Sequence, residues 1–413
     1  MRIKNLLITL IISLLFAKAL AQQPLLSLDS VPKKAAPAAP AFPRTGRTNT
    51  PLANLYYGPG TDRLGGAKRE TLDSGVVLTL AGRAGNLYRV ALAPNQTGYV
   101  PAEQIQLDSL TTLTDSTLAP ITYLTGNWTV YGDSLFDYVA MRLPARLPYQ
   151  TRQEVAPNRV VLDVFGATAN TNWITQLNTA QTLERVWFEQ VADGHFRVTV
   201  ALKTPRHGPT HWGYSVYYQR NTLMIRFRRP PPGRGLRGLT IAVDAGHGGT
   251  NTGAKGEQTG QLEKDLTLDL AHRLTTYLER AGARVVLVRQ TDTTLSPGQR
   301  VMAMRRQLPH VLVSLHFNSS ANAGVRGVST YYKHLGFRPW SQTVLTELLR
   351  KLPVREFGNV GHFNFFFNSP TDYPNLLVEG PFLSNPTDES LIIDPAFRQK
   401  MAKAIARGLR RMR

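Results

Sequence analysis

The sequence predicts an α/β domain with a mainly parallel central sheet, preceded by two small all-β domains. Between residues 239 and 413, apolar strand-like runs alternate with amphipathic helical runs, which is typical of parallel α/β sheets. Residues 51–107 and 120–229 contain short runs of alternating polarity separated by Gly, Asn and Pro, as in antiparallel sheets. Residues 230–238 form a Pro/Gly/Arg linker, because three consecutive prolines continue neither a strand nor a helix.

Length and composition agree with this division. The chain has 413 residues, of which 42% are hydrophobic and 18% charged, enough to build several folded cores. It contains no cysteine, which excludes disulfides, iron–sulfur clusters, thiolate zinc sites and a cysteine nucleophile. The formal net charge of +20 favours anionic polymers as partners but does not choose between nucleic acid, lipid and cell wall.

Residues 1–21 are predicted to be a cleaved signal peptide. Arg2 and Lys4 precede a short apolar run over 6–16, and Ala-Leu-Ala follows at 19–21, the order of a signal sequence and its cleavage site. The alternative is an uncut anchor, but the run is short for about 30 Å of hydrocarbon. We therefore expect an exported protein of the periplasm or cell envelope, with no stable transmembrane segment after cleavage and no nucleic-acid partner.

Residues 22–50 are rich in Ala, Pro and Thr and are predicted to be a tether. The next block, 51–107, has Tyr-Gly-Pro-Gly at 57–60 and Gly-Tyr-Val at 98–100. This order resembles bacterial SH3 domains, which implies a wall-binding module. The alternative is a structural barrel with no ligand.

Residues 120–229 contain strands of alternating polarity, of which 159–164 and 196–202 are the clearest. The repeated Arg-Val-hydrophobic pattern resembles the amidase N-terminal (AMIN) domain, an all-β module that targets envelope amidases. His207 and His211 lie close together in this block. We interpret them as turn and packing residues and not as metal ligands.

The α/β block can be divided into elements by its hydrophobic pattern. Strands are expected at 239–244, 284–288, 310–315 and 376–378, and helices at 262–278, 298–307 and 395–411. In open α/β sheets, ligands bind at the carboxyl ends of the strands. The polar residues at those ends are therefore the candidates for a functional site.

Four such residues stand out. His247 and His316 each follow a strand, Glu263 opens the first helix and Glu379 closes a later strand. Two histidines and a glutamate form a ligand set typical of catalytic zinc, with one coordination position left open. Glu379 then remains available for acid–base chemistry.

Four motifs occur in a fixed order around these residues. They are Asp244-Ala245-Gly246-His247-Gly248-Gly249, Glu263-Lys264-Asp265, Ser314-Leu315-His316-Phe317-Asn318 and the run from Glu379 to Asp388. Together with Val288-Arg289-Gln290-Thr291-Asp292 and Arg300, they resemble the catalytic domain of the zinc-dependent N-acetylmuramoyl-L-alanine amidases that separate bacterial cells. The resemblance covers residues 239–413.

The resemblance implies a mixed, mainly parallel central sheet and a zinc ion on His247, Glu263 and His316. It also implies that Glu379 is the catalytic carboxylate. The substrate would be peptidoglycan, cut at the amide between N-acetylmuramic acid and L-alanine by zinc-activated water. Three further residues are expected to bind substrate: Asn318, Arg289 and Arg300.

The sequence departs from the family at two places. Gly380-Pro381 follows the expected catalytic Glu379, which predicts a differently shaped loop, and Met304-Arg305 replaces the usual Ala-Asn. Only 62 residues separate His316 from Glu379, with no clear room for the helical insertion of autoinhibited members. We therefore expect a site that is open without an activator.

Three alternatives remain open at this point. One is a peptidoglycan-binding protein that has lost turnover or waits for an activator. Another is a different zinc hydrolase of peptidoglycan, such as a stem-peptide carboxypeptidase or a deacetylase. The third is a structural or adhesion protein. An activator or another envelope protein is expected as a partner of the two β modules.

Overall fold

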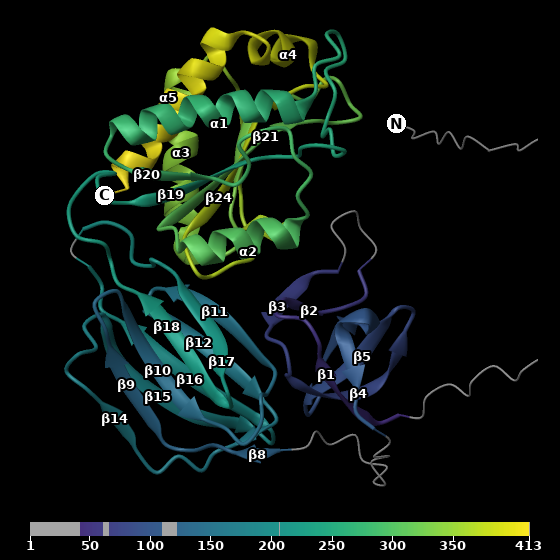
Figure 1. The fold of residues 1–413 in the computed structure, drawn as a ribbon, viewed down its shortest axis with the longest axis vertical. Coiled ribbons are helices and arrows are strands. Elements are labelled where there is room, and N and C mark those ends of the chain that lie inside the picture. Colours follow the sequence, from purple (N-terminus) through teal and green to yellow (C-terminus); the bar gives the residue numbers. More distant parts are fainter. Residues whose placement is uncertain (1–41, 61–65, 110–121, 206, 413) are drawn as a thin grey trace, which may run out of the picture. The chain divides into compact units, whose positions relative to one another are not determined.

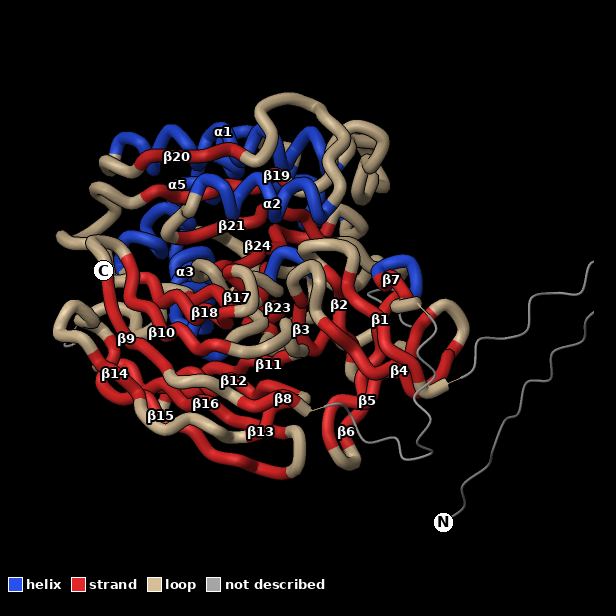
Figure 2. The backbone as a smooth tube through the Cα atoms, turned by 60° about the horizontal axis from the view of Figure 1, so that its bottom comes forward, coloured by secondary structure: helices blue, strands red, loops and turns tan. Residues whose placement is uncertain are grey.

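The computed structural model describes residues 42–60, 66–109, 122–205 and 207–412. The predicted signal peptide and most of the predicted tether lie outside the described residues. Within the described residues, the α-helices occur only after strand β19, and Figure 2 shows that the segments before it consist mainly of strands. All described residues belong to one compact unit.

The first seven strands form one antiparallel sheet in the order β3-β2-β6-β5-β4-β1-β7, here called the N-terminal sheet. Its strands are β1 (Arg44–Thr48), β2 (Ala53–Tyr56), β3 (Lys68–Leu72), β4 (Val77–Ala84), β5 (Leu87–Ala93), β6 (Gln96–Pro101) and β7 (Ile105–Leu107). Strand β1 lies inside the segment predicted as a tether, so the predicted boundary at residue 50 was wrong. Its sequence, Arg-Thr-Gly-Arg-Thr, has no apolar alternation, and backbone pairing with β4 and β7 holds it in the sheet.

The second β-rich segment forms two facing sheets, here called the sandwich. One sheet has the order β14-β9-β10-β18-β17 and the other β11-β12-β16-β15, with β8 and β13 paired beside them. The strands are β8 (Tyr123–Leu124), β9 (Trp128–Gly132), β10 (Phe136–Arg142), β11 (Tyr149–Val155), β12 (Asn158–Phe165), β13 (Ala167–Thr168), β14 (Ile174–Gln176), β15 (Leu183–Ala192), β16 (His195–Leu202), β17 (Tyr214–Gln219) and β18 (Thr222–Arg228).

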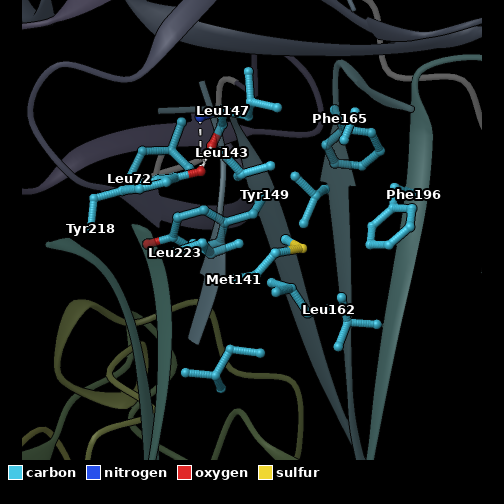
Figure 3. Close-up of a cluster of buried hydrophobic side chains, with 14 of the residues drawn as sticks. Leu72, Met141, Leu143, Leu147, Tyr149, Leu162, Phe165, Phe196, Tyr218 and Leu223 are labelled. Atoms are coloured by element: carbon cyan, nitrogen blue, oxygen red, sulfur yellow. Dashed lines mark hydrogen bonds between the residues drawn. The ribbon is translucent and has the colours of Figure 1, made fainter. Parts of the chain in front are cut away.

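The sandwich and the N-terminal sheet share one hydrophobic core. Figure 3 shows Met141, Leu162 and Phe196 of the sandwich in a cluster that also contains Leu72 of strand β3. Tyr218 lies in the same cluster. Its hydroxyl is satisfied there, because it donates to the Leu147 carbonyl and accepts from the Leu147 amide, both at 2.8 Å. The two β-rich segments are therefore packed together through buried apolar surface.

The C-terminal part, from residue 239, is an α/β domain whose six-stranded sheet has the order β20-β19-β21-β24-β22-β23. Its strands are β19 (Thr240–Ala245), β20 (Arg284–Leu287), β21 (Val311–Asn318), β22 (Val328–Tyr331), β23 (Glu356–Val360) and β24 (Asn375–Phe382). All neighbours are parallel except β22 and β24. The prediction of a mixed, mainly parallel sheet is confirmed.

Helices cover both faces of this sheet (Figure 1). They are α1 (Glu263–Arg280), α2 (Pro297–Gln307), α3 (Arg338–Lys351), α4 (Pro386–Ile392) and α5 (Pro395–Arg411). Buried side chains of α1, α3 and α5 join one core cluster with β19 and β21. Helix α2 packs on the opposite face through Val301 and Met304. A capping box of Ser296 and Gln299 starts α2, which fixes where this helix begins.

Gly380-Pro381, which departs from the family pattern, does not reshape a loop as predicted. Glu379 does not lie in a loop, because β24 continues through Gly380 and Pro381 to Phe382. A Cβ atom on residue 380 would lie 2.5 Å from the Phe317 ring, so glycine is required for the close approach of β24 to β21.

Within the described residues, no helix has both the length and the apolar composition to cross a bilayer.

Candidate metal centre

His247 lies in the loop that follows β19. Its backbone has φ of 62°, a left-handed conformation that is unfavourable for a residue with a side chain and is found at functional sites. Its Nδ1 atom lies 2.9 Å from the Asn251 Oδ1 atom. Since an amide oxygen only accepts, Nδ1 carries the proton and Nε2 of the neutral ring keeps a lone pair.

Glu263 is the first residue of α1, and its side chain is almost fully buried. Its Oε2 atom accepts from the Ala254 amide at 2.8 Å, and Oε1 accepts from the Phe317 amide at 3.1 Å. Both oxygens are thus held in place by backbone groups. A side chain at residue 253 would lie 2.5 Å from Oε2, which explains the glycine at this position.

His316 lies near the end of β21 and is 7% exposed. Its Nδ1 atom lies 3.2 Å from His247 Nε2 and 3.1 Å from Glu263 Oε1, and the latter two atoms are 3.1 Å apart. A Cβ atom on residue 246 would lie 2.4 Å from the His316 ring. Gly246 therefore lets the histidine ring approach the loop of His247.

These three atoms form a nearly equilateral triangle of electron-pair donors. Atoms about 2.0–2.2 Å from a tetrahedral zinc ion lie about 3.3–3.6 Å apart, close to the spacing found here. In the part of the chain that the structure describes, His247, Glu263 and His316 are the group of side chains able to hold a metal ion. The donor set fits a divalent ion of the zinc type.

The electrostatics of the triangle also fit a cation. Burial would raise the pKa of Glu263, but the two histidines hold it well below its usual range. Burial would lower the pKa of His316, but the Glu263 carboxylate raises it to about 9. The Glu263 carboxylate therefore stays ionised and attracts a divalent cation to the space between the three donors.

Glu379 stands next to this triangle. In the sheet register it pairs with His316 of β21 on one side and with Ser329 of β22 on the other. Directly paired residues point to the same face of a sheet, so the carboxylate faces the same space as the His316 ring. It also contributes to the raised pKa of His316.

The two arginines that were expected to bind substrate are buried. Arg289 donates through Nε to the Ala245 carbonyl at 2.9 Å. Arg300 forms an ion pair with Asp244 at 2.7 Å and donates to the His247 carbonyl. Both guanidinium groups therefore hold the segment that carries His247. Asn318, the third residue expected at the substrate, ends β21 and is half-buried.

Sequence reasoning missed two neighbours of the triangle. Asn251 fixes the ring of His247. In the sequence it differs from other polar loop residues only by lying four positions after His247. Phe365 stands perpendicular to His316, with 5.9 Å between the ring centres. In the sequence it is marked only by the phenylalanine-rich stretch Phe-Asn-Phe-Phe-Phe at 363–367.

Known proteins are similar to the part of the chain that carries these residues. Residues 241–411 match the family described as N-acetylmuramoyl-L-alanine amidase. The germination-specific N-acetylmuramoyl-L-alanine amidase of Bacillus subtilis is 31% identical over 194 residues, which cover 43% of this chain and 80% of that protein. The chain belongs to the N-acetylmuramoyl-L-alanine amidase family.

Two further proteins are similar to this chain. The probable cell wall amidase LytH of Staphylococcus epidermidis is 30% identical over 210 residues, which cover 51% of this chain and 70% of that protein. The solved catalytic domain of the amidase CwlV from Bacillus (Paenibacillus) polymyxa is 30% identical and covers 41% of this chain and 95% of that domain, with a TM-score of 0.40. The family match at 241–411 contains all three residues of the triangle and Glu379.

Proposed function

We propose that the α/β domain hydrolyses the amide between N-acetylmuramic acid and L-alanine in peptidoglycan, with zinc on His247, Glu263 and His316 and with Glu379 as general base and acid. The observation that carries this proposal is the triangle of donor atoms, 3.1–3.2 Å apart, beside an additional carboxylate. Membership of the amidase family supports the choice of substrate and bond.

An amide resists hydrolysis because its carbonyl is a poor electrophile and its nitrogen a poor leaving group. When bound, a zinc ion supplies Lewis acidity, which polarises a carbonyl and makes water more acidic. The chain supplies the proton transfers. Glu379 takes a proton from the water as the water oxygen bonds to the carbonyl carbon, and it returns this proton to the amide nitrogen as the C–N bond breaks. The N-acetylmuramic acid side is left as a carboxylic acid, and the stem peptide leaves with a neutral amine on its L-alanine.

The buried arginines and Asn318 have different roles in this proposal. Arg289 and Arg300 keep the His247 loop in its strained conformation, because their donors are used by carbonyls and by Asp244. Asn318 lies two residues beyond His316 and is half-buried, and we assign it to substrate binding.

The remaining features concern where the enzyme acts. We propose that residues 1–21 direct export, that the protein works in the periplasm or cell envelope, and that the N-terminal sheet and the sandwich are SH3-like and AMIN-like modules. Their support is the strand-rich structure of both segments and the positive charge of the chain, +20, which is attracted to anionic walls.

We also propose that the site works without an activator. The stretch from His316 to Glu379 holds one α-helix, α3, and its side chains Val344, Leu345 and Leu348 are buried in the core on the α1 and α5 face. This helix is thus part of the fold. The isolated protein should therefore cleave peptidoglycan, and silence until a partner protein is added would contradict this.

The test of the proposal is the chemical identity of the products. Purified peptidoglycan is incubated with the mature protein, with and without a chelator, and the soluble fraction is analysed by mass spectrometry. Release of whole stem peptides with a free L-alanine amine, lost on chelation and restored by zinc, is the expected result. Release of acetate or of single amino acids would indicate a deacetylase or a carboxypeptidase, and binding without release would indicate a wall-binding protein.

A further inference from the structure

Residues 361–369, here called the aromatic segment, pass beside His316. The ring of Phe365 stands at 90° to the imidazole of His316, with 5.9 Å between the ring centres. Phe363 stacks on Phe365 at 5.7 Å. Because these rings fill the space beside one of the proposed ligands, whatever fixes the aromatic segment also shapes the proposed active site.

The inner side of the aromatic segment is fixed by the α/β domain itself. Phe367 is buried in the small core that α2 forms with the sheet. Asn368 donates through Nδ2 to the Tyr331 carbonyl at 3.3 Å. These contacts anchor the C-terminal half of the aromatic segment, which follows Phe365.

The outer side is fixed by the N-terminal sheet, almost 300 residues away in the sequence. The Asn364 side chain donates through Nδ2 to the Gly66 carbonyl at 2.9 Å, and its Oδ1 atom accepts from the Lys68 amide at 3.1 Å. One amide group is thus bound at both ends to the backbone that leads into β3. Asn364 is the direct neighbour of Phe365.

Two lysines strengthen this contact. Lys68 places its Nζ atom 4.3 Å from the centre of the Phe366 ring, a cation–π arrangement. Lys333 of the α/β domain donates through Nζ to the Lys68 carbonyl at 3.2 Å. The aromatic segment is therefore held at Asn364 and Phe366 by Gly66 and Lys68, at the start of β3.

We propose that the N-terminal sheet acts on the reaction itself, because its contact with Asn364 holds the aromatic segment against His316. Asn364 is then a positioning residue of the amidase site. This inference rests on the proposed function. It assigns the N-terminal sheet a role that differs from wall binding, since a wall-binding module changes turnover only of the insoluble wall, whereas a positioning module also changes turnover of a small soluble substrate.

The full mature chain allows a direct test with three variants. Asn364→Ala removes the hydrogen bonds to Gly66 and Lys68 and also a weaker one at 3.4 Å, which Oδ1 accepts from Lys333 Nζ. Asn364→Asp keeps an acceptor for the Lys68 amide and for Lys333 but loses the donor to Gly66. Arg69→Ala is the matched control. Arg69 lies on the same strand and donates to Gln150 of the sandwich at 2.6 Å, so it joins two β-rich segments without touching the aromatic segment.

Two quantities are measured for each variant: kcat and KM on one soluble disaccharide-pentapeptide unit of peptidoglycan, and hydrogen exchange of the peptides that cover 361–369, β19 and α1. We expect Asn364→Ala to lose about tenfold in kcat/KM, in line with the cost of small displacements at reacting groups. Asn364→Asp should lose less, and Arg69→Ala should match the wild type. Exchange should rise at 361–369 in Asn364→Ala and stay unchanged in β19 and α1.

The inference is overturned if Asn364→Ala keeps wild-type kcat/KM, if exchange at 361–369 stays unchanged in that variant, or if Arg69→Ala loses as much activity as Asn364→Ala. A wild-type chain that cleaves neither the soluble unit nor the wall would contradict the proposed function. The exchange measurement then decides the inference alone: faster exchange at 361–369 supports the contact, and unchanged exchange refutes it.

Discussion

At the scale of single residues, the three proposed ligands are oriented by hydrogen bonds from neighbouring groups. Asn251 sets the proton position on His247, and backbone amides fix both oxygens of Glu263. This arrangement holds three donors 3.1–3.2 Å apart.

The first prediction concerns Glu379. Because it stands outside the triangle, Glu379→Gln should fold and bind zinc as the wild type does, yet lose about 10²–10⁴ in kcat, the usual contribution of a general acid–base group. The measurement is kcat on soluble peptidoglycan fragments, together with metal content and thermal unfolding as controls. Turnover near that of the wild type would assign the proton transfers to another group.

The second prediction concerns the buried ion pair of Arg300 and Asp244. Asp244 is fully buried, so Arg300→Met leaves its charge without a counterion and should lower the free energy of unfolding by about 3–5 kcal/mol. Ser314→Ala, which removes only a neutral donor at 2.7 Å, should cost about 1 kcal/mol. Denaturant unfolding of both variants checks this, and equal costs would show that the ion pair does not hold the loop.

At the scale of elements, strongly patterned segments could be predicted and weakly patterned ones could not. The leucine stripe of α1 was visible because Leu266, Leu270 and Leu274 face a core. Strand β23, with the sequence Glu-Phe-Gly-Asn-Val at the sheet edge, has no such alternation, and neither has β1. Backbone pairing with neighbouring strands places both in their sheets, and pairing leaves no trace in local composition.

The third prediction concerns the approach of β24 to β21. Gly380→Ala places a Cβ atom 2.5 Å from the Phe317 ring and should lower the free energy of unfolding by about 1–3 kcal/mol through overpacking. Gly298→Ala in α2 is the control, because nothing lies within 4 Å of its Cβ position and alanine favours helices. A Gly380→Ala variant as stable as Gly298→Ala would show that the two strands can separate without cost.

At the scale of the whole molecule, sequence reasoning treated the β-rich segments as modules beside an independent enzyme. The sequence pattern showed where each segment was rich in strands. It did not show the shared core around Leu72 and Met141 or the contacts of Asn364 with Gly66 and Lys68. These contacts join residues far apart in the chain, and no local pattern encodes them. The same limit applies to the site, where the ligands were visible but Asn251 and Phe365 were not.

The fourth prediction concerns a buried histidine between the sandwich and the α/β domain. His211 lies against Gly336, and burial lowers its pKa from 6.5 to about 4. The unfolded chain therefore binds a proton more readily than the folded one between these values. Stability should fall as pH drops from 6.5 to 4, by up to about 3 kcal/mol from this group.

His211→Asn cannot titrate in this range and serves as the comparison. The difference in free energy of unfolding between wild type and variant is measured by denaturant titration at several pH values. We expect the advantage of the wild type to shrink as the pH falls below 6.5. A difference that stays constant down to pH 4 would show that His211 does not resist protonation.

The measurement that tests the central claim most directly is activity as a function of bound zinc. Metal-free mature protein is titrated with zinc, and metal content and hydrolysis of peptidoglycan are determined on the same samples. The account predicts that activity rises in proportion to zinc and levels off at about one ion per chain, and that His247→Ala and His316→Ala neither bind that ion nor act. Full activity of the metal-free protein, or normal zinc binding by both histidine variants, would contradict it.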